Sequence, residues 1–183
     1  EPADTDEFLV SDAGTIKRID YSLIKGGGIT VADQFRVNAS IAFSSEQVVN
    51  TNWERIDTSG QGTLGSGMSE SSGIFTFPST GIYLVRFVCT SYKDGDSRYI
   101  INGIQVTTNN SSYSDIAAGY DSITRSESST TYANATAESL VDVTDTSNVK
   151  VRFTIRAHSG DAYLSTSSSV NRNTATFIRL EDT

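Results

Sequence analysis

Hydrophobic and polar residues alternate along two segments of the chain with the two-residue period of a β-strand. Every second position is apolar over residues 35–43, and Arg36, Asn38 and Ser40 occupy positions between them. The same alternation returns over residues 149–155. Because successive side chains of a strand point to opposite faces, each segment is predicted to bury one face and to leave the other in water.

A third predicted strand, residues 81–89, is apolar on both of its faces. An antiparallel sheet ordinarily leaves its second face to water, so the second apolar face requires a cover. A neighbouring subunit is one source of that cover, and another sheet or loop of the same chain is the alternative. The predicted core residues are Phe35, Ile41, Phe43, Phe75, Phe87, Val151 and Phe153, and the second apolar face carries Ile82, Leu84 and Val88.

The first 28 residues are predicted to be separate from the main domain. Two short apolar runs flank a turn at residues 12–14 and indicate a small hairpin over residues 8–19. A lone hairpin is marginal in water, so it is expected to pack on the main domain, on neighbouring chains or on a preceding stalk. The Gly-rich residues 25–28 form a flexible joint. Residues 29–183 are then one domain, long enough to bury its own core.

Two stretches rich in Ser, Thr, Asn and Gly, residues 109–137 and 165–173, are interpreted as loops. Tyr113, Tyr120 and Tyr132 lie within the first stretch. Tyrosine supplies rigid contact area in many binding loops, and Ser and Asn supply adaptable hydrogen bonds. These three tyrosines are therefore candidate ligand-binding residues. The alternative is that both stretches are solvated connectors with ordinary surface tyrosines.

The net charge limits the classes of partner. A formal charge of -8 repels phosphate backbones, and the basic residues are not gathered into one stripe, so a nucleic-acid partner is not expected. No stretch approaches the roughly 20 apolar residues that span a bilayer as a helix. Membrane insertion is therefore not expected either.

Candidate catalytic and metal-binding residues are few. Cys89, the only cysteine, lies in an apolar run where a small buried side chain is expected, and His158, the only histidine, is expected in a surface loop. One of each cannot form a zinc site of the usual ligands, so the chain is predicted to be no enzyme and to need no cofactor. Calcium is the one ion that remains a candidate, although solvated turn acids are the simpler interpretation. The calcium candidates are Asp94 and Asp96, and secondarily Asp142 and Asp145.

The run of residues 72–87 resembles the signature of the complement-one-q globular domain, a relative of tumour necrosis factor. Residues 53–56 and 173–180 are similar to other parts of that domain, in the same order. The resemblance implies a ten-stranded, double-sheet jelly roll that assembles as a homotrimer, with one sheet facing the three-fold axis. The matched signature residues are Gly73, Phe75, Thr76, Pro78, Gly81 and Tyr83, and the residues expected at the axis are Ile82, Leu84, Val88, Tyr99 and Phe177.

Residues 6–19 are similar to linker segments of bacteriophage fibres and other virion proteins, whereas collagen-like Gly-X-Y repeats and a cysteine pair are lacking. Together the resemblances imply a viral structural protein located in the virion: the homotrimeric tip of a tail fibre or head appendage, contributing to host attachment. Its expected partners are copies of itself, other virion proteins through the N-terminal segment, and a host surface glycan or protein.

Two alternatives to the attachment role remain open. The first is a capsid decoration or fibre-capping protein that binds no receptor. The second, less favoured, is a glycan-degrading depolymerase. Such an enzyme generally needs a pair of carboxylates, and the acidic residues of this chain are dispersed along the sequence.

Overall fold

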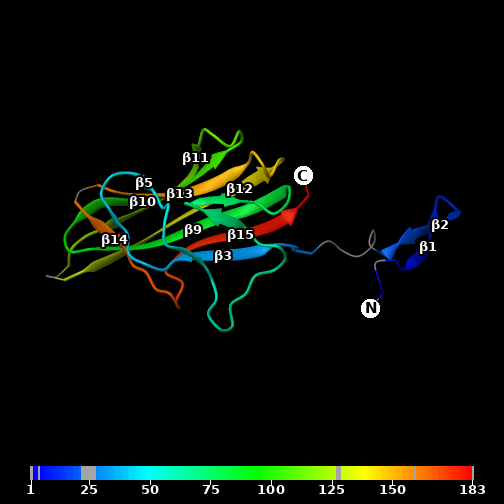
Figure 1. Cartoon of the computed structure of the whole chain (residues 1–183), viewed down its shortest axis with the longest axis horizontal. Helices are drawn as coiled ribbons and strands as arrows, with labels where there is room; N and C mark the ends of the chain where they lie inside the picture. Colours follow the sequence, from blue (N-terminus) through cyan, green and yellow to red (C-terminus); the bar gives the residue numbers. More distant parts are fainter. Residues whose placement is uncertain (1, 4, 22–27, 127–128, 159, 183) are drawn as a thin grey trace.

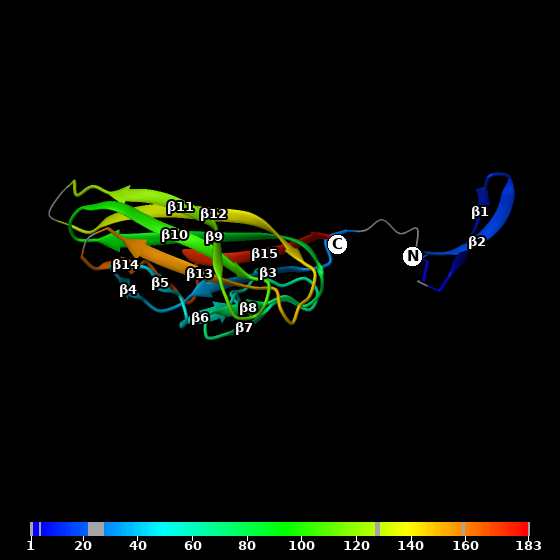
Figure 2. The same cartoon turned by 90° about the horizontal axis from the view of Figure 1, so that it is seen from above.

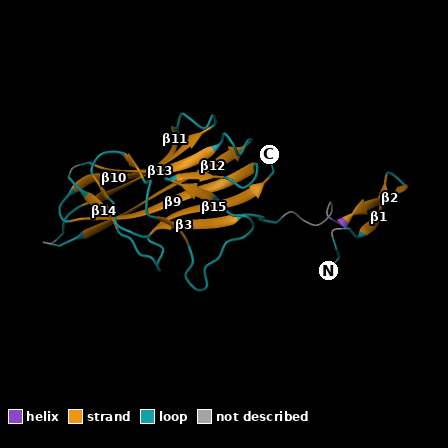
Figure 3. Ribbon diagram, viewed as in Figure 1, coloured by secondary structure: helices purple, strands orange, loops and turns teal. Residues whose placement is uncertain are grey.

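The computed structural model of the chain describes residues 2–3, 5–21, 28–126, 129–158 and 160–182. Strands make up most of these residues, and they form two layers and a separate hairpin (Figure 3). Among the described residues no helix has the length and hydropathy needed to span a membrane. The all-β fold class predicted from the alternating pattern is confirmed.

The N-terminal hairpin pairs β1 (Glu7–Asp12) with β2 (Thr15–Asp20). Ala13 and Gly14 have φ angles of 48° and 85°, which are the positive values that the two central residues of a type I′ turn require. The hairpin predicted over residues 8–19 is confirmed. It lies apart from the two layers in both perpendicular views (Figures 1 and 2). Residues 25–27 of the predicted joint lie outside the described residues.

The two layers are antiparallel sheets of six and seven strands within the described residues. The six-stranded sheet contains β5 (Gln47–Val48), β7 (Ser69–Ser71), β8 (Ile74–Thr76), β10 (Ser97–Thr107), β11 (Ser114–Ile123) and β13 (Lys150–Ala157). The seven-stranded sheet contains β3 (Ala32–Val37), β4 (Ala42–Phe43), β6 (Trp53–Arg55), β9 (Gly81–Lys93), β12 (Thr131–Val143), β14 (Ala162–Leu164) and β15 (Asn173–Glu181). The double-sheet architecture agrees with the prediction, and short strands such as β4 and β5 raise the strand number above ten.

Strand β9 is the centre of the seven-stranded sheet. It pairs along its whole length with β12 on one edge, and with β15 and then β14 on the other. Its odd-numbered side chains from Tyr83 to Cys89 are buried, whereas the even-numbered ones are partly or fully exposed. The two apolar faces predicted for residues 81–89 are confirmed, and they meet different environments: one lines the core and the other points outward.

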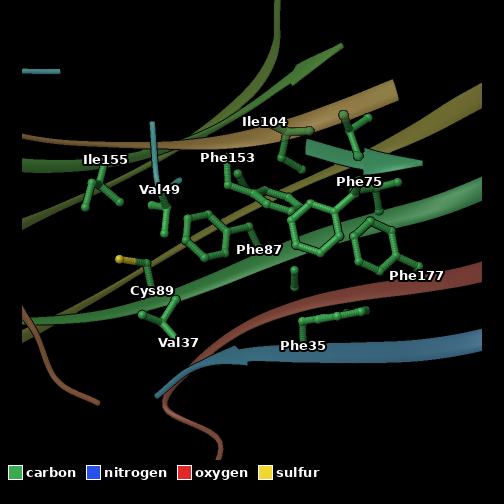
Figure 4. Packing of buried hydrophobic residues seen from close by; sticks show 14 of the residues in the cluster. Phe35, Val37, Val49, Phe75, Phe87, Cys89, Ile104, Phe153, Ile155 and Phe177 are labelled. Carbon is green, nitrogen blue, oxygen red and sulfur yellow. The ribbon is translucent and has the colours of Figure 1, made fainter. Parts of the chain in front are cut away.

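An aromatic cluster fills the space between the two sheets (Figure 4). Phe75 lies within it, with ring centroids 5.2 Å from Phe35 and 5.1 Å from Phe177. Trp53 packs edge-on against Phe75 at 5.1 Å and donates its indole N–H to the Val49 carbonyl. Tilted and edge-to-face pairs of this kind contribute stability beyond the area they bury. The cluster therefore joins the two sheets.

The segment predicted as one strand over residues 35–43 is interrupted. β3 ends at Val37 and β4 begins at Ala42, and between them Ala39 is exposed while Ile41 is only partly buried against the core. The reason is a change of partner, since β3 pairs with β15 whereas β4 pairs with β14. The other six predicted core residues are buried.

Arg36, predicted to face water, is wholly buried with 0% exposure, so that prediction is wrong. Its guanidinium donates to Glu54 Oε2 at 2.9 Å and pairs with Asp57. It also donates to Thr58 Oγ1 at 3.0 Å and to Gln61 Oε1 at 3.2 Å. A buried guanidinium is tolerated only when its charge and its N–H donors are satisfied in this way. Residues 57–61 therefore fold over the outer surface of β3.

Residues 109–137, interpreted as a loop, contain β11 and half of β12, so that interpretation is wrong. The first buried positions of β12 are alanines, among them Ala135 and Ala137, whose small side chains do not stand out from a polar background. β11 also comes very close to β12: a Cβ added to Gly119 would lie 2.2 Å from the backbone oxygen of Thr136. Both strands are thus built from residues that usually indicate loops.

We expect Phe75→Ala to lower the free energy of unfolding of the sandwich by about 3–5 kcal/mol, because it leaves a cavity among the core rings. Urea unfolding followed by circular dichroism measures the change. Phe8→Ala on the separate hairpin is the matched control and should alter the sandwich transition by less than about 0.5 kcal/mol. Equal effects of the two substitutions would contradict the assignment of the core.

Candidate interaction surface

The outward face of the seven-stranded sheet is the face turned away from the core. Its side chains are the even-numbered residues of β9 together with their register partners on β12, β15, β3 and β14. Because partner residues on adjacent strands lie side by side, these side chains form rows across the sheet. Successive rows are two residues apart, or about 7 Å along the strands.

One row of the outward face is apolar over four strands. Leu140 of β12 lies opposite Leu84 of β9. Leu84 lies opposite Ile178 of β15, which in turn lies opposite Ala32 of β3. Leu140 is 61% exposed, and the other three are partly exposed. Single exposed apolar residues are common on protein surfaces, whereas contiguous apolar patches indicate contact surfaces.

A second row consists of three tyrosines from three neighbouring strands. Tyr92 of β9 lies opposite Tyr132 of β12 and Tyr163 of β14. The ring of Tyr92 is 5.7 Å from that of Tyr132 and stacks on that of Tyr163 at 5.5 Å with an interplanar angle of 21°. Tyr132 is 60% exposed. The tyrosine row lies roughly 26 Å along β9 from the apolar row.

The rows between the apolar row and the tyrosine row are mostly polar, with Val88 as the apolar exception on β9. Arg86 of β9 is paired with Glu138 of β12, with 3.8 Å between Nε and Oε2. Thr176 of β15 accepts a hydrogen bond from Gln34 Nε2 at 2.7 Å. Exposed pairs of this kind contribute little to stability. The outward face therefore combines apolar, aromatic and hydrogen-bonding areas, as protein–protein interfaces do.

Three of the five residues predicted at a trimer axis lie on the outward face. Ile82, Leu84 and Val88 are all partly exposed and all belong to the even-numbered series of β9. Tyr92 and Tyr163 were not predicted. Tyr92 could have been found from the sequence, because it continues the even-numbered series of Ile82 along the same strand. Tyr163 joins the row only because β14 pairs with β9.

The structure places neither Tyr99 nor Phe177 on the outward face of the seven-stranded sheet, and the burial of Phe177 contradicts its prediction. Phe177 is 0% exposed and belongs to the aromatic core, so its side chain has no surface to offer another subunit. Tyr99 lies on β10 in the other sheet, where its ring contacts that of His158 at 5.0 Å. The position of Tyr99 is therefore separate from the outward face of the seven-stranded sheet.

The three tyrosines predicted in binding loops do not form one site. Tyr113 immediately precedes β11 and lies under the guanidinium of Arg152, 4.0 Å from its ring centroid. Partial burial raises the pKa of Tyr113, and the charge of Arg152 opposes that effect. Tyr120 projects from β11 with 69% exposure, whereas Tyr132 belongs to the tyrosine row of the opposite sheet. Two of the three therefore lie within strands rather than in loops.

The first calcium candidates have protein partners. Asp94 pairs with Arg125 at 3.3 Å, and Asp96 Oδ1 accepts the backbone N–H of Arg125 at 2.7 Å. The two acids thus connect the turn between β9 and β10 to the segment that follows β11. This role within the fold accounts for both residues.

The second calcium candidates are a surface residue and a turn residue. Asp142 is exposed on β12, opposite Ile82. Asp145 accepts the backbone N–H of Ser147 at 2.7 Å, and this hydrogen bond holds the pKa of its carboxyl below the ordinary value. Across the described ranges, no group of three or more His, Cys, Asp or Glu side chains is placed to hold a metal ion.

Cys89 is enclosed in the core, and His158 lies at the surface. Burial raises the pKa of the Cys89 thiol to about 12, although a contact of 3.4 Å with Ser91 Oγ opposes the shift. A thiol becomes nucleophilic when its pKa is lowered, not raised. His158 is exposed just after β13 and meets the ring of Tyr99. Both positions agree with the structural roles predicted for them.

Comparison with solved structures shows which known fold the chain resembles. The chain matches the structure of Eiger TNF from S. frugiperda with a TM-score of 0.62 and 15% identity, covering 85% of this chain and 96% of that one. Murine APRIL matches at pH 5.0 with a TM-score of 0.58 and 14% identity, over 82% of this chain and 98% of APRIL. At pH 8.5 murine APRIL matches with a TM-score of 0.55, 14% identity and the same coverage.

No protein-family model matches the sequence, and no curated protein matches it either. At identities of 14% and 15%, the likeness to Eiger TNF and APRIL concerns the fold. The chain has a tumour necrosis factor-like jelly-roll fold, as the resemblance at residues 72–87 predicted.

We expect the Cys89 thiol of the folded protein to be unreactive at pH 8. With a pKa of about 12 in place of 9.0, the thiolate fraction is roughly 1,000-fold smaller than in the unfolded chain. An aromatic disulfide reagent should therefore detect the thiol in denaturant and not in native buffer, with Cys89→Ala as the blank. Rapid reaction of the native protein would show that Cys89 is accessible.

Proposed function

We propose that the chain is a homotrimeric structural and binding module of a bacteriophage virion, the tip of a tail fibre or head appendage that contributes to attachment to the host surface. The observation that carries self-association is the outward face of the seven-stranded sheet. Its apolar row and its tyrosine row lie on one surface at opposite ends of β9.

Self-association removes this apolar surface from water. Each Å² of apolar surface removed from water contributes about 25 cal/mol, and Leu140 and Tyr132 each expose more than half of their surface in the single chain, at 61% and 60%. A second copy presents the same combination of apolar, aromatic and polar rows. The trimeric symmetry follows from the resemblance to complement-one-q and tumour necrosis factor domains, and three equivalent sites would add avidity to attachment.

The N-terminal segment, residues 1–28, is proposed to connect the trimer to other virion proteins. Leu9 and Ile16 on the hairpin are 74% and 65% exposed. Because an isolated two-stranded hairpin is marginal in water, these side chains are suited to packing against a neighbouring protein. The similarity of residues 6–19 to linker segments of phage fibres supports the same role, with residues 29–183 as the module that it carries.

Two other functions compete with attachment. A capsid decoration or fibre-capping trimer would use the same outward face and have no receptor. A depolymerase would generally need a pair of carboxylates, and the sequence singles out no such pair. Cys89, the one cysteine, is buried in the core. We therefore propose a role without catalysis.

We expect the full chain to sediment as a trimer and Tyr132→Glu to shift it toward the monomer, because charge repulsion and desolvation oppose burial of three added carboxylates. Sedimentation velocity over a range of concentrations measures the shift. Tyr120→Glu, at a tyrosine of similar exposure on the other sheet (69% against 60%), is the matched control and should remain trimeric. A folded wild-type monomer at high concentration would refute self-association.

We further expect antibodies against the purified chain to label intact virions of the phage that encodes it, at the distal end of a tail or head appendage. Immunogold electron microscopy locates the label. Labelling spread evenly over the capsid would favour the decoration role, and unlabelled virions would exclude a virion location.

A further inference from the structure

The six-stranded sheet carries a recess on its own outer face, on the opposite side of the sandwich from the outward face described above. Gly103 of β10 lies opposite Ala118 of β11 on one side and Thr154 of β13 on the other. These three residues have small side chains and form the floor of the recess across three strands. A Cβ added to Gly103 would lie 2.5 Å from Thr154 Oγ1, so a side chain at this position would displace the Thr154 hydroxyl and fill part of the floor.

The rows on either side of this floor carry larger side chains. On one side Tyr120, Ile101 and Arg156 are register partners across the same three strands. On the other side lies Asp115, whose carboxylate accepts a hydrogen bond from Gln105 Nε2 at 2.9 Å. The recess has a cavity volume of about 230 Å³ and is also lined by Glu46, next to β5.

Several groups lining the recess have unused hydrogen-bonding capacity. Within the described part of the chain, the Tyr120 hydroxyl, the Glu46 carboxylate and the Thr154 hydroxyl have no hydrogen-bond partner. The Arg156 guanidinium lies 5.4 Å from the ring centroid of Tyr99 and has no carboxylate partner there. Hydrogen-bond donors and acceptors, including positively and negatively charged side chains, thus converge on the concave surface of the recess. A few converging polar groups of this kind are usual in small-ligand sites.

We propose that this recess binds one sugar unit of a host surface glycan. A pyranose ring has an apolar C–H face, which suits the electron-rich face of the exposed Tyr120 ring. Its hydroxyl groups donate and accept at once, and so they match the carboxylate of Glu46, the hydroxyl of Thr154 and the guanidinium of Arg156. The cavity is smaller than the roughly 300–1,000 Å³ of most small-molecule pockets, which fits a single unit of a longer chain.

The charge of the recess separates this ligand class from others. Glu46 and Asp115 oppose Arg156, so a strongly anionic ligand meets two carboxylates and a strongly cationic one meets a guanidinium. The polar walls offer little to a lipid chain. A hydroxyl-rich ligand of low charge is the class that satisfies all the walls together.

Sugar binding in the recess would give the attachment role a specific ligand. It rests on the proposed function only for the source of the glycan, the host surface. The recess lies on the six-stranded sheet, on the side away from the proposed subunit interface. Binding in the recess is therefore expected in the trimer and in a dissociated monomer alike, whereas the sedimentation experiment depends on the opposite sheet. The two tests can fail independently.

The test is an NMR titration of the isotope-labelled full chain with the methyl glycosides of glucose, galactose, rhamnose and N-acetylglucosamine, each at millimolar concentration. We expect saturable shift changes with at least one glycoside, centred on residues around Gly103 and Tyr120. Ala118→Phe fills the recess and Tyr120→Ala removes its aromatic wall, so each should weaken binding by about tenfold or more. Ser122→Phe adds the same ring further along β11 and should bind as the wild type does.

Four results would overturn the assignment: the four glycosides cause no saturable shifts, the shifts cluster away from the recess, both recess variants bind as well as the wild type, or trilysine causes larger recess shifts than any glycoside. The last result would favour a peptide ligand. Because Ala118 and Tyr120 are exposed positions, their variants should fold, and the dispersion of the NMR spectrum checks this directly.

Discussion

The pairing of β9 with β12 on one edge and with β15 and β14 on the other fixes the middle of the seven-stranded sheet. It also determines which side chains form each surface. With both edges occupied, the register of β9 is fixed, and burial of its large odd-numbered side chains leaves its even-numbered residues facing outward. Phe87 then meets the aromatic cluster, while Leu84 and Tyr92 become central members of the apolar and tyrosine rows. The core and the proposed subunit interface are two consequences of one register.

Much of the fold could be predicted from the sequence where apolar side chains are large and alternate strictly, as around Phe87 and Phe153. The hairpin could be predicted because Asp12 and Gly14 stand at a turn between two short apolar runs. β11 and the start of β12 could not be predicted. Their buried positions include Ala135 and Gly119, which are small, and Gly119 is required by the close approach of β11 to β12. Arg36 was misplaced for a related reason: its carboxylate partners, Glu54 on the neighbouring strand β6 and Asp57 in the loop that follows, are 18 and 21 residues away in the sequence.

The candidate surface could be predicted only in part. Ile82 and Leu84 follow from the alternation within one strand, but a row across strands depends on pairing that a single sequence does not reveal. Tyr163 joins Tyr92 through such a pairing. The prediction for Phe177 was wrong because β15 has apolar residues at both odd and even positions. Only its register with β9 determines that the odd-numbered ones enter the core. The recess on the six-stranded sheet was missed for the same reason, since Gly103, Ala118 and Thr154 are far apart in sequence.

The first and last long strands of the sandwich, β3 and β15, are antiparallel neighbours, with Ala32 opposite Ile178. The chain therefore enters and leaves the sandwich at one end (Figure 1), through backbones about 5 Å apart. Two ends this close allow the whole sandwich to be spliced into a surface loop of an unrelated carrier without stretching either junction. The strand order would therefore allow the module to be transferred between carrier proteins, with the loops at the opposite end of the sandwich left free.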